Sequence, residues 1–424
     1  MTGNSKPGRT VAGVVDNDSA YASTVAAGGG YAFFSATGAD ESGKLSAAPQ
    51  GVYARSDSAA ARAEAETLYT SLKNALPEVG SGIDQVVQVE QYVRLKNHAD
   101  GYFAAALRPT LLGTGTANGA TAQIGTFVPA DAAIQVTGMA VVPDAATGRV
   151  KTFPGSDGSP TGKFADPVGA GPYFFTTMFP MDRNLEGLPA GVKVGGWSWN
   201  ESEIRSETKW AIDQLTAKLA AQGATLADIV NYSVLLADLG DLYEFDLLLR
   251  EAIGDDLRAP SRSVLHLAGS ALPRREGAFG HEEGAARLEI QFRCAIPGGD
   301  AITRVGTPTA DSIARSGYQS AATKVDDIVW LSSQFASDGV LGSGAAEIDD
   351  IFTALAATCA EAGTDISQLL RARAQLSSAA LVPDFYRALR KFVPDQPPAV
   401  TLAVTPTLAV PGAHVSIDGV ALAL

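Results

Sequence analysis

The chain repeats one order of segments three times, and this repetition restricts its possible folds more than any other feature. Each copy opens with a β-rich run that ends in small hydroxyl residues. A segment with apolar residues at helical spacing follows, and a strand of alternating character closes the copy. The opening runs are 31–38, 172–179 and 328–335, the helical segments are 61–76, 207–223 and 347–363, and the closing strands are 134–143, 288–297 and 415–424. This order predicts three copies of one supersecondary unit.

Loop-forming residues separate the copies and give three units, 1–145, 146–298 and 299–424. Gly, Pro and Asp are dense at both borders, 143–163 and 297–311. Each unit has a further β-rich run after its helical segment, so strands come before, between and after the helices. This order predicts an α+β fold with helices on one face of a sheet. Like units could then cover the sheet edges and apolar faces that each leaves open.

Composition narrows the partners and the compartment. The chain has 32 Lys and Arg against 46 Asp and Glu, a net charge of −14, which makes binding to phosphate backbones unfavourable. No apolar run reaches membrane-spanning length, and the polar start is not a signal peptide. Only Cys294 and Cys359 are present, and the four histidines lack ligand spacing. We therefore expect a cytoplasmic protein without disulfides, metal or cofactor, and with no nucleic-acid or membrane partner.

The second unit carries the most distinctive motif. Pro260-Ser261-Arg262-Ser263 precedes Leu272-Pro273, and a strand with Leu288-Glu289-Ile290 follows. The third unit shows the same opening and closing order in 316–335 and 396–422, and the first unit is the most divergent. All three units resemble domains of the RidA/YjgF family, the reactive-intermediate deaminases, and the resemblance covers nearly the whole chain. It implies a fold similar to chorismate mutase. Because the family forms homotrimers, three fused domains would form an intramolecular pseudo-trimer, a monomer in solution.

The resemblance also implies a reaction. The arginine of the family's motif, here Arg262, would grip the carboxylate of a small imine or enamine acid, because a guanidinium binds a carboxylate through two parallel hydrogen bonds. The acid of the closing strand, here Glu289, would orient the water that releases ammonia. At the position of Arg262 we align Thr121 in the first unit and Val400 in the third. At the position of Glu289 we align Gln135 and Ser416. Only the second unit keeps both groups.

Four further residues match the pocket lining of the family. Its early tyrosine corresponds to Tyr21 and Tyr318, and its early serine corresponds to Ser332 and to Thr176. The sequence therefore predicts one competent site, built on Arg262 and completed by the tyrosine and serine of a neighbouring unit.

Other interpretations stay open. Arg262 could pair with a structural carboxylate such as Glu289 and hold the units together, although the family motif favours the catalytic role. The two tyrosines could be interface packing. The protein as a whole could be a non-catalytic ligand-binding or scaffold protein, because two units lack the arginine. A hydrolase similar to the chorismatases is a further alternative, although those use two tandem domains. The substrate itself does not follow from the sequence.

Overall fold

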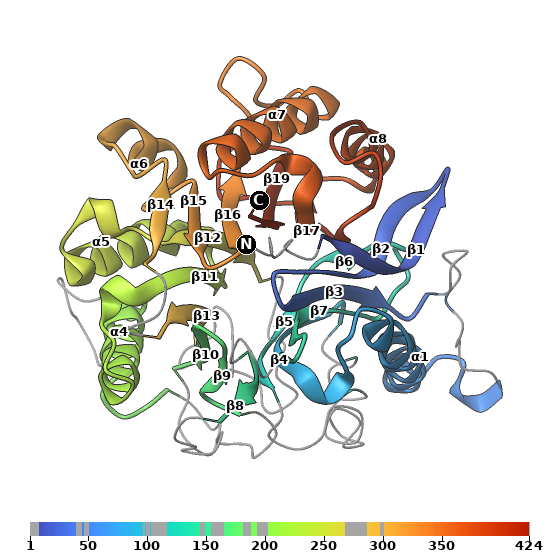
Figure 1. Ribbon diagram of the computed structural model, residues 1–424, viewed down its shortest axis with the longest axis horizontal. Coiled ribbons are helices and arrows are strands. Elements are labelled where there is room, and N and C mark those ends of the chain that lie inside the picture. The colour runs from blue at the N-terminus through green and yellow to red at the C-terminus, as the bar shows by residue number, and fades with distance from the viewer. Residues whose placement is uncertain are drawn as a thin grey trace, which may run out of the picture.

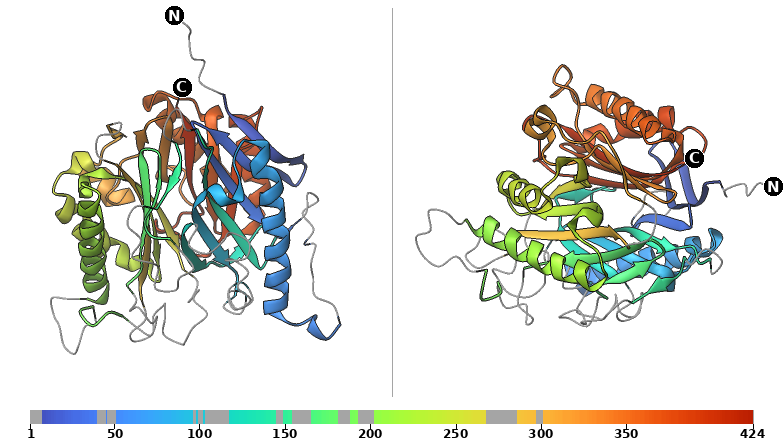
Figure 2. Two further views of the ribbon diagram at one scale, coloured as in Figure 1. Left: turned by 60° about the horizontal axis from the view of Figure 1, so that its bottom comes forward. Right: turned by 60° about the vertical axis from the view of Figure 1, so that its left-hand side comes forward.

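The computed structural model describes residues 8–39, 45, 51–95, 98, 102, 117–144, 149–153, 165–180, 188–192, 202–267, 286–296 and 301–423. Leu272 and Pro273 of the family motif lie outside these residues. The strands lie toward the middle of the molecule, and the helices lie around the outside (Figure 1). Figure 2 shows α1 and α4 on opposite sides of the strands. The fold is thus a mixed α/β fold with large sheets.

The first strand set follows the order β2-β3-β7-β4-β5 across the sheet. Its elements are β2 (Ala20–Gly28), β3 (Tyr31–Thr37), α1 (Asp57–Glu78), β4 (Val86–Val93), β5 (Asn118–Gln123) and β7 (Ile134–Val141). Two more strands pair outside this order: β1 (Thr10–Asn17) with β2, and β6 (Thr126–Phe127) with β18. Helix α1 begins after Ser56, whose side chain accepts a hydrogen bond from the Ala59 amide and so caps the first turn.

The second strand set follows the order β9-β10-β13-β11-β12, with β8 beside β9. Its elements are β8 (Lys151–Thr152), β9 (Val168–Ala170), β10 (Tyr173–Met178), α4 (Glu203–Ala221), β11 (Ile229–Leu236), α5 (Leu242–Ile253), β12 (Ser261–His266) and β13 (Leu288–Ala295). Helix α5 ends at Gly254, whose φ of 71° is the left-handed conformation that glycine adopts most readily.

The third strand set follows the order β15-β16-β19-β17-β18, with β14 beside β15. Its elements are β14 (Thr303–Val305), α6 (Ala310–Ser316), β15 (Ala322–Val325), β16 (Ile328–Gln334), α7 (Ala345–Glu361), β17 (Leu369–Leu376), α8 (Val382–Phe392), β18 (Ala399–Val404) and β19 (Val415–Leu422).

The three strand sets have one topology. In each, a hairpin pairs with the closing strand, which is β7, β13 or β19. The closing strand pairs antiparallel with the strand after the long helix, which is β4, β11 or β17. That strand pairs parallel with the strand at the end of the set, which is β5, β12 or β18. A register shift occurs near the start of the strand after the helix in all three sets. The strands and helices predicted from the repeated segments are confirmed.

A buried glutamate on each long helix fastens that helix to the closing strand of its own set. Glu64 accepts hydrogen bonds from the amides of residues 133 and 134, Glu207 from residue 287, and Glu347 from residues 414 and 415. The amide of residue 288 also interacts with Glu207. These amides precede or begin β7, β13 and β19. In all three sets, a glutamate therefore accepts backbone hydrogen bonds where the closing strand begins.

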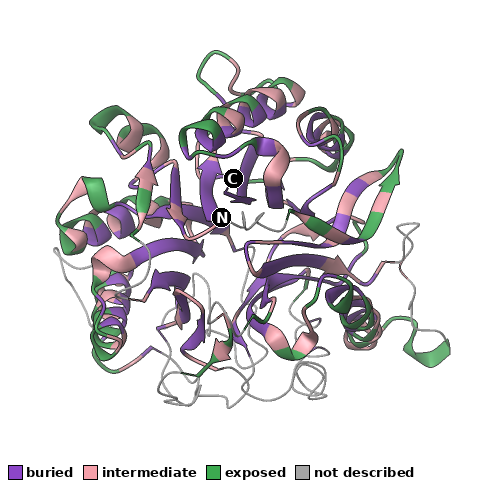
Figure 3. Cartoon of the chain, in the orientation of Figure 1, coloured by how far each residue is buried: buried purple, intermediate pink, exposed green. Residues whose placement is uncertain are grey.

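Each strand set buries one face against its own helices. The three cores centre on Leu68 and Leu72 with α1, Leu215 and Phe245 with α4 and α5, and Phe352 with α7 and α8. Figure 3 shows most strands as buried, β1 as largely exposed, and the outer surfaces of the helices as exposed. The amphipathic pattern of the helical segments matches this placement.

Three equivalent backbone hydrogen bonds join the strand sets to one another. The Ala165 amide donates to the Ala117 carbonyl at 3.1 Å, and the Ser320 amide to the Pro260 carbonyl at 3.0 Å. The Ser23 amide donates to the Pro398 carbonyl at 2.9 Å. The three acceptors each stand one residue before β5, β12 and β18. The last strand of each set thus contacts the hairpin of the next set, and the third set contacts the first.

The faces turned away from the helices meet in two shared apolar clusters. One contains Tyr31, Tyr173 and Trp330, whose rings pack edge to face. The other contains Tyr92 and Leu235. Both clusters draw residues from all three sets. No helix among the described residues is long and apolar enough to cross a membrane.

Candidate functional site

Arg262 lies on β12, on the face of the sheet that α5 covers. Its strand neighbour Tyr232 belongs to the core beneath the helices, so the arginine side chain also leaves the strand toward α5. The guanidinium forms an ion pair with Asp246 of α5. Its Nη2 donates to the Ser316 carbonyl at 2.6 Å, and its Nε donates to Gln319 Oε1 at 3.3 Å. Arg262 is 1% exposed, and each guanidinium nitrogen has an acceptor.

The Asp246 carboxylate is the partner of the Arg262 guanidinium. Its second oxygen accepts a hydrogen bond from the Tyr318 amide at 2.9 Å. Burial opposes the charge of Arg262, but Asp246 raises the pKa of the guanidinium. Gly317 allows this close packing, because a Cβ there would lie 2.3 Å from Arg262 Nη2. The structure therefore pairs Arg262 with a structural carboxylate, which is Asp246 and not Glu289.

Glu289 lies on β13 at the contact between the second and first strand sets. Its carboxyl group is buried beside the Thr121 amide of β5 and near Glu90 of β4. Burial, with a contribution from the charge of Glu90, raises the pKa of Glu289 to about 8. A carboxyl group in this environment is mostly protonated at neutral pH and can donate a proton.

The structure does not bring Arg262 and Glu289 together. In the strand register Arg262 stands opposite Tyr232, which in turn stands opposite Phe292, whereas Glu289 stands opposite Leu235. Residues at even and odd positions of β13 point to opposite faces, so the two side chains leave opposite faces of the sheet. Arg262 meets the third strand set and Glu289 meets the first.

The register also corrects two alignments made from the sequence. Gly119 stands opposite Val89, as Arg262 stands opposite Tyr232, so Gly119 and not Thr121 takes the place of Arg262 in the first set. Val400 does take that place in the third set. Thr176 stands opposite Phe292 and so corresponds to Leu331; the residue beside it, Thr177, corresponds to Ser332. Both errors are short slips in segments without a Pro-Ser-Arg-Ser motif to fix the alignment.

Two of the four predicted lining residues lie beside Arg262. Ser332 Oγ accepts a hydrogen bond from the Arg262 amide at 2.8 Å, and Tyr318 supplies its amide to Asp246. The other two lie elsewhere. The Tyr21 hydroxyl donates to the Val393 carbonyl at 2.6 Å, at the contact of the first and third sets. The Thr176 hydroxyl donates to Asp166 at 2.6 Å.

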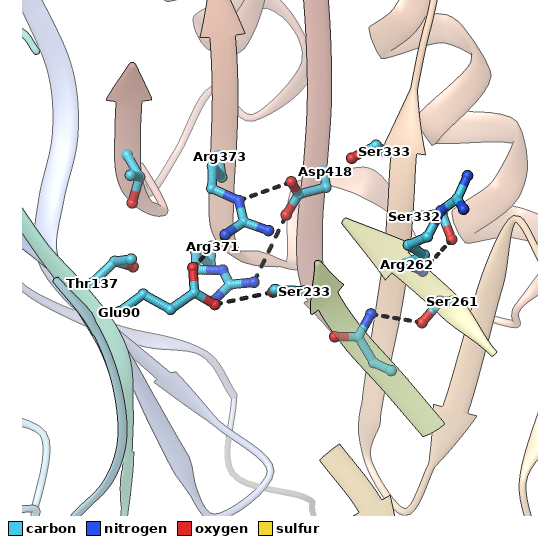
Figure 4. Close-up of polar contacts among 12 residues, drawn as sticks. Glu90, Thr137, Ser233, Ser261, Arg262, Ser332, Ser333, Arg371, Arg373 and Asp418 are labelled. Carbon is cyan, nitrogen blue, oxygen red and sulfur yellow. Dashed lines mark hydrogen bonds and ion pairs between the residues drawn. The ribbon is translucent and has the colours of Figure 1, made fainter. Parts of the chain in front are cut away.

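A second group of polar side chains lies between the three strand sets, and sequence reasoning missed it. Glu90 comes from β4, Arg293 from β13, Arg371 and Arg373 from β17, and Asp418 from β19. We call these five residues the interior charged cluster. All are buried, and Figure 4 shows Glu90, Arg371, Arg373 and Asp418 turned toward one another, with Arg262 set apart.

The Glu90 carboxylate is the centre of the interior charged cluster. It accepts from Arg293 Nη2 at 2.7 Å, from the Ser233 hydroxyl at 3.0 Å, and from Arg373 and Tyr92. Burial alone would raise the pKa of Glu90, but the two guanidinium groups hold it well below its usual range. Glu90 is therefore a fully ionised anion that joins all three strand sets.

The interior charged cluster is not balanced by its own residues. Three guanidinium groups face two carboxylates, which leaves one net positive charge. Arg373 donates from Nε to Asp418 at 2.9 Å, but Arg371 only approaches Asp418 at 3.8 Å. Arg293 Nε, Arg371 Nε and Arg373 Nη2 have no hydrogen-bond acceptor among the described residues. Each buried N–H group without an acceptor costs about 1–3 kcal/mol of stability.

The sequence did carry a signal for the interior charged cluster. Charged residues recur at alternate positions of strands that are otherwise apolar, as in LLRARAQL (369–376) and LEIQFRCA (288–295). Charges on a fully buried strand need partners. Only the relative placement of the three sets shows which residues those partners are.

The comparisons with known proteins give likeness to solved structures alone. No family profile matches the chain, and no curated protein matches it. A member of the highly conserved YjgF/YER057c/UK114 family from Mycobacterium tuberculosis is 19% identical, with 29% of this chain and 99% of that chain covered and a TM-score of 0.26. A YjgF family member from Neisseria meningitidis is 22% identical, covering 30% and 98%, with a TM-score of 0.26. A chorismatase is 10% identical, covering 80% and 93%, with a TM-score of 0.47.

Proposed function

We propose that the three strand sets are related units, 1–145, 146–298 and 299–424, closed on one another as a pseudo-trimer within one chain. The three equivalent backbone bonds between sets support this arrangement, because they run from first to second, second to third and third to first. The glutamate repeated on each long helix supports the relation between the units. Since the chain supplies all three units, we expect one chain per particle by light scattering; particles of three chains would contradict this.

We propose that the protein binds a small ligand and does not hydrolyse imines. The unbalanced positive charge of the interior charged cluster supports ligand binding. One observation carries the second part of the proposal: the guanidinium of Arg262 is already held by Asp246, on the opposite face of the sheet from Glu289. A substrate carboxylate would have to displace a buried carboxylate of the chain itself, and breaking such a pair is strongly unfavourable. Glu289, the acid that should orient water, would still lie on the opposite face of the sheet.

One observation favours a hydrolase as the second candidate. The carboxyl group of Glu289 has a pKa near 8, in the range suited to general acid and base catalysis at neutral pH. Its surroundings hold no cation among the described residues that would bind a substrate carboxylate there. A buried acid at a contact between units is also accounted for by packing.

Imine hydrolysis measured directly separates the two candidates. A 2-imino acid is generated in situ by an amino-acid oxidase, and its disappearance is followed with and without the protein. We expect no acceleration by the wild type and the same rates with Glu289→Gln and Arg262→Lys. An acceleration by the wild type that both substitutions abolish would establish the hydrolase and contradict the proposal.

A further inference from the structure

The interior charged cluster lies between two apolar layers. Along β17, Leu370 belongs to the apolar cluster around Trp330, then Arg371 and Arg373 follow at alternate positions. Along β4, Glu90 is followed by Tyr92, which belongs to the second apolar cluster. The side chain of Arg293 also lies against the Trp330 ring, with 5.2 Å from Cζ to the ring centroid. The excess positive charge is therefore held away from bulk water, where it is least tolerated.

Among the residues that the structure describes, no third carboxylate balances the cluster. At the position of Glu90 the other two sets carry Ser233 and Arg373. At the position of Asp418 they carry Thr137 and Gln291, which are neutral. Burial and the charge of Glu90 raise the pKa of Glu289 to about 8, so this acid is mostly protonated at neutral pH. Water could accept hydrogen bonds from the free N–H groups but could not cancel the charge.

We infer that the interior charged cluster binds a small monoanion whose atoms accept hydrogen bonds from Arg293, Arg371 and Arg373. A single negative charge completes the balance of three guanidinium groups against two carboxylates. Ligand atoms that only accept hydrogen bonds suit the three N–H groups that lack acceptors. The ligand class is therefore a carboxylate such as formate or acetate, or an inorganic monoanion such as nitrate or chloride. The inference rests on the proposed function in ligand binding, and it names the site and the ligand class.

Arg371 is the residue whose removal tests the inference. It makes no hydrogen bond to the described residues and forms only an ion pair at 3.8 Å with Asp418, so its substitution removes the excess charge and that one ion pair. Arg371→Met removes the charge and keeps the length of the side chain. Arg387→Met is the matched control, because Arg387 lies on α8 with 62% of its side chain exposed.

The experiment is equilibrium urea unfolding of the full chain at constant ionic strength, with formate, acetate, nitrate or chloride as the varied anion. A ligand of the native state raises the stability in a saturable way. We expect saturable stabilisation of the wild type and of Arg387→Met by at least one anion, and a loss of about tenfold or more in apparent affinity in Arg371→Met. A larger effect of the carboxylates would identify an organic ligand, and a larger effect of nitrate or chloride an inorganic one.

Equal responses of Arg371→Met and the wild type, or no saturable response to any of the four anions, would overturn the inference. If Arg371→Met does not fold, carbon-13 formate and the wild type provide the second measurement. We then expect either one bound formate per chain or the displacement of one bound chloride by formate. If neither is observed, the inference is overturned. These outcomes are independent of the imine assay, so failure of the site and failure of the proposed function can be told apart.

Discussion

At the scale of the residue, Arg262 shows how far a motif can predict a contact. The sequence predicted that the tyrosine and serine of a neighbouring unit complete the site of this arginine, with Tyr21 and Tyr318 both as candidates; the structure places Tyr318 and Ser332 beside it. The partner of the guanidinium could not be predicted. Asp246 lies 16 residues earlier, on a helix whose distance from β12 depends on the packing of the whole set.

Removal of the Asp246 carboxylate should convert the contact into a binding site. We expect Asp246→Ala to lose roughly 3–5 kcal/mol of stability, because Arg262 is left buried and unpaired. Millimolar acetate or formate should restore part of that loss by taking the place of the missing carboxylate. Urea unfolding measures both effects, with the half-exposed Asp349→Ala as control. If neither anion restores part of the lost stability, Arg262 does not bind a free carboxylate in place of that of Asp246.

The raised pKa of Glu289 predicts a pH dependence of stability. The folded protein keeps this proton up to about pH 8, whereas the unfolded chain releases it near the ordinary value of 4.5. The unfolded state therefore binds fewer protons between these values, and stability falls as pH rises, by at most about 1.4 kcal/mol per pH unit. Glu289→Gln removes this contribution.

Unfolding free energies measured from pH 4 to 9 test this prediction. The stability of Glu289→Gln relative to the wild type should increase from about pH 4.5 to about pH 8 and stay level above that. Glu207, whose pKa burial also raises to about 8, is common to both proteins and cancels in the difference. Parallel profiles would show that Glu289 titrates normally.

At the scale of the element, the repeated pattern was enough to predict the strands and the long helices. The spacing of apolar residues distinguishes helices from strands, and each copy shows that spacing. The register was predicted only where the motif is strong. Without it, the alignments at Thr121 and Thr176 slipped by two residues and by one, because a slip of two residues keeps the period of a strand and because Thr177, beside Thr176, is the same residue type. The glutamates on α1, α4 and α7 were also missed, since their acceptor role depends on the sheet beneath.

The glutamate of α7 is the clearest test of this element. Glu347 accepts from the amides of Gly342, Gly344, His414 and Val415. We expect Glu347→Ala to cost on the order of 3 kcal/mol or more in unfolding experiments, because buried amides lose their acceptor. Glu361→Ala, at the exposed end of the same helix, should change stability by less than about 0.5 kcal/mol. Equal effects of the two substitutions would show that Glu347 does not fasten α7 to β19.

At the scale of the whole molecule, the proposed fusion of three units would free their equivalent positions to diverge. In a homotrimer one residue would face its own two copies around the axis. Here Glu90, Ser233 and Arg373 occupy that one position. The Glu90 carboxylate accepts hydrogen bonds from both the Ser233 hydroxyl group and the Arg373 guanidinium. A chain of identical units could not build this cluster. The sequence indicated the divergence but could not show that the diverged residues meet.

A crystal structure of the full chain grown with sodium bromide tests the central claim most directly, because bromide is a monoanion that anomalous scattering locates. We predict one strong bromide peak per chain between Arg293, Arg371 and Arg373, with Arg262 still paired with Asp246. A structure with no bromide among these three arginines, and with the anion bound instead to an Arg262 released from Asp246, would contradict the account.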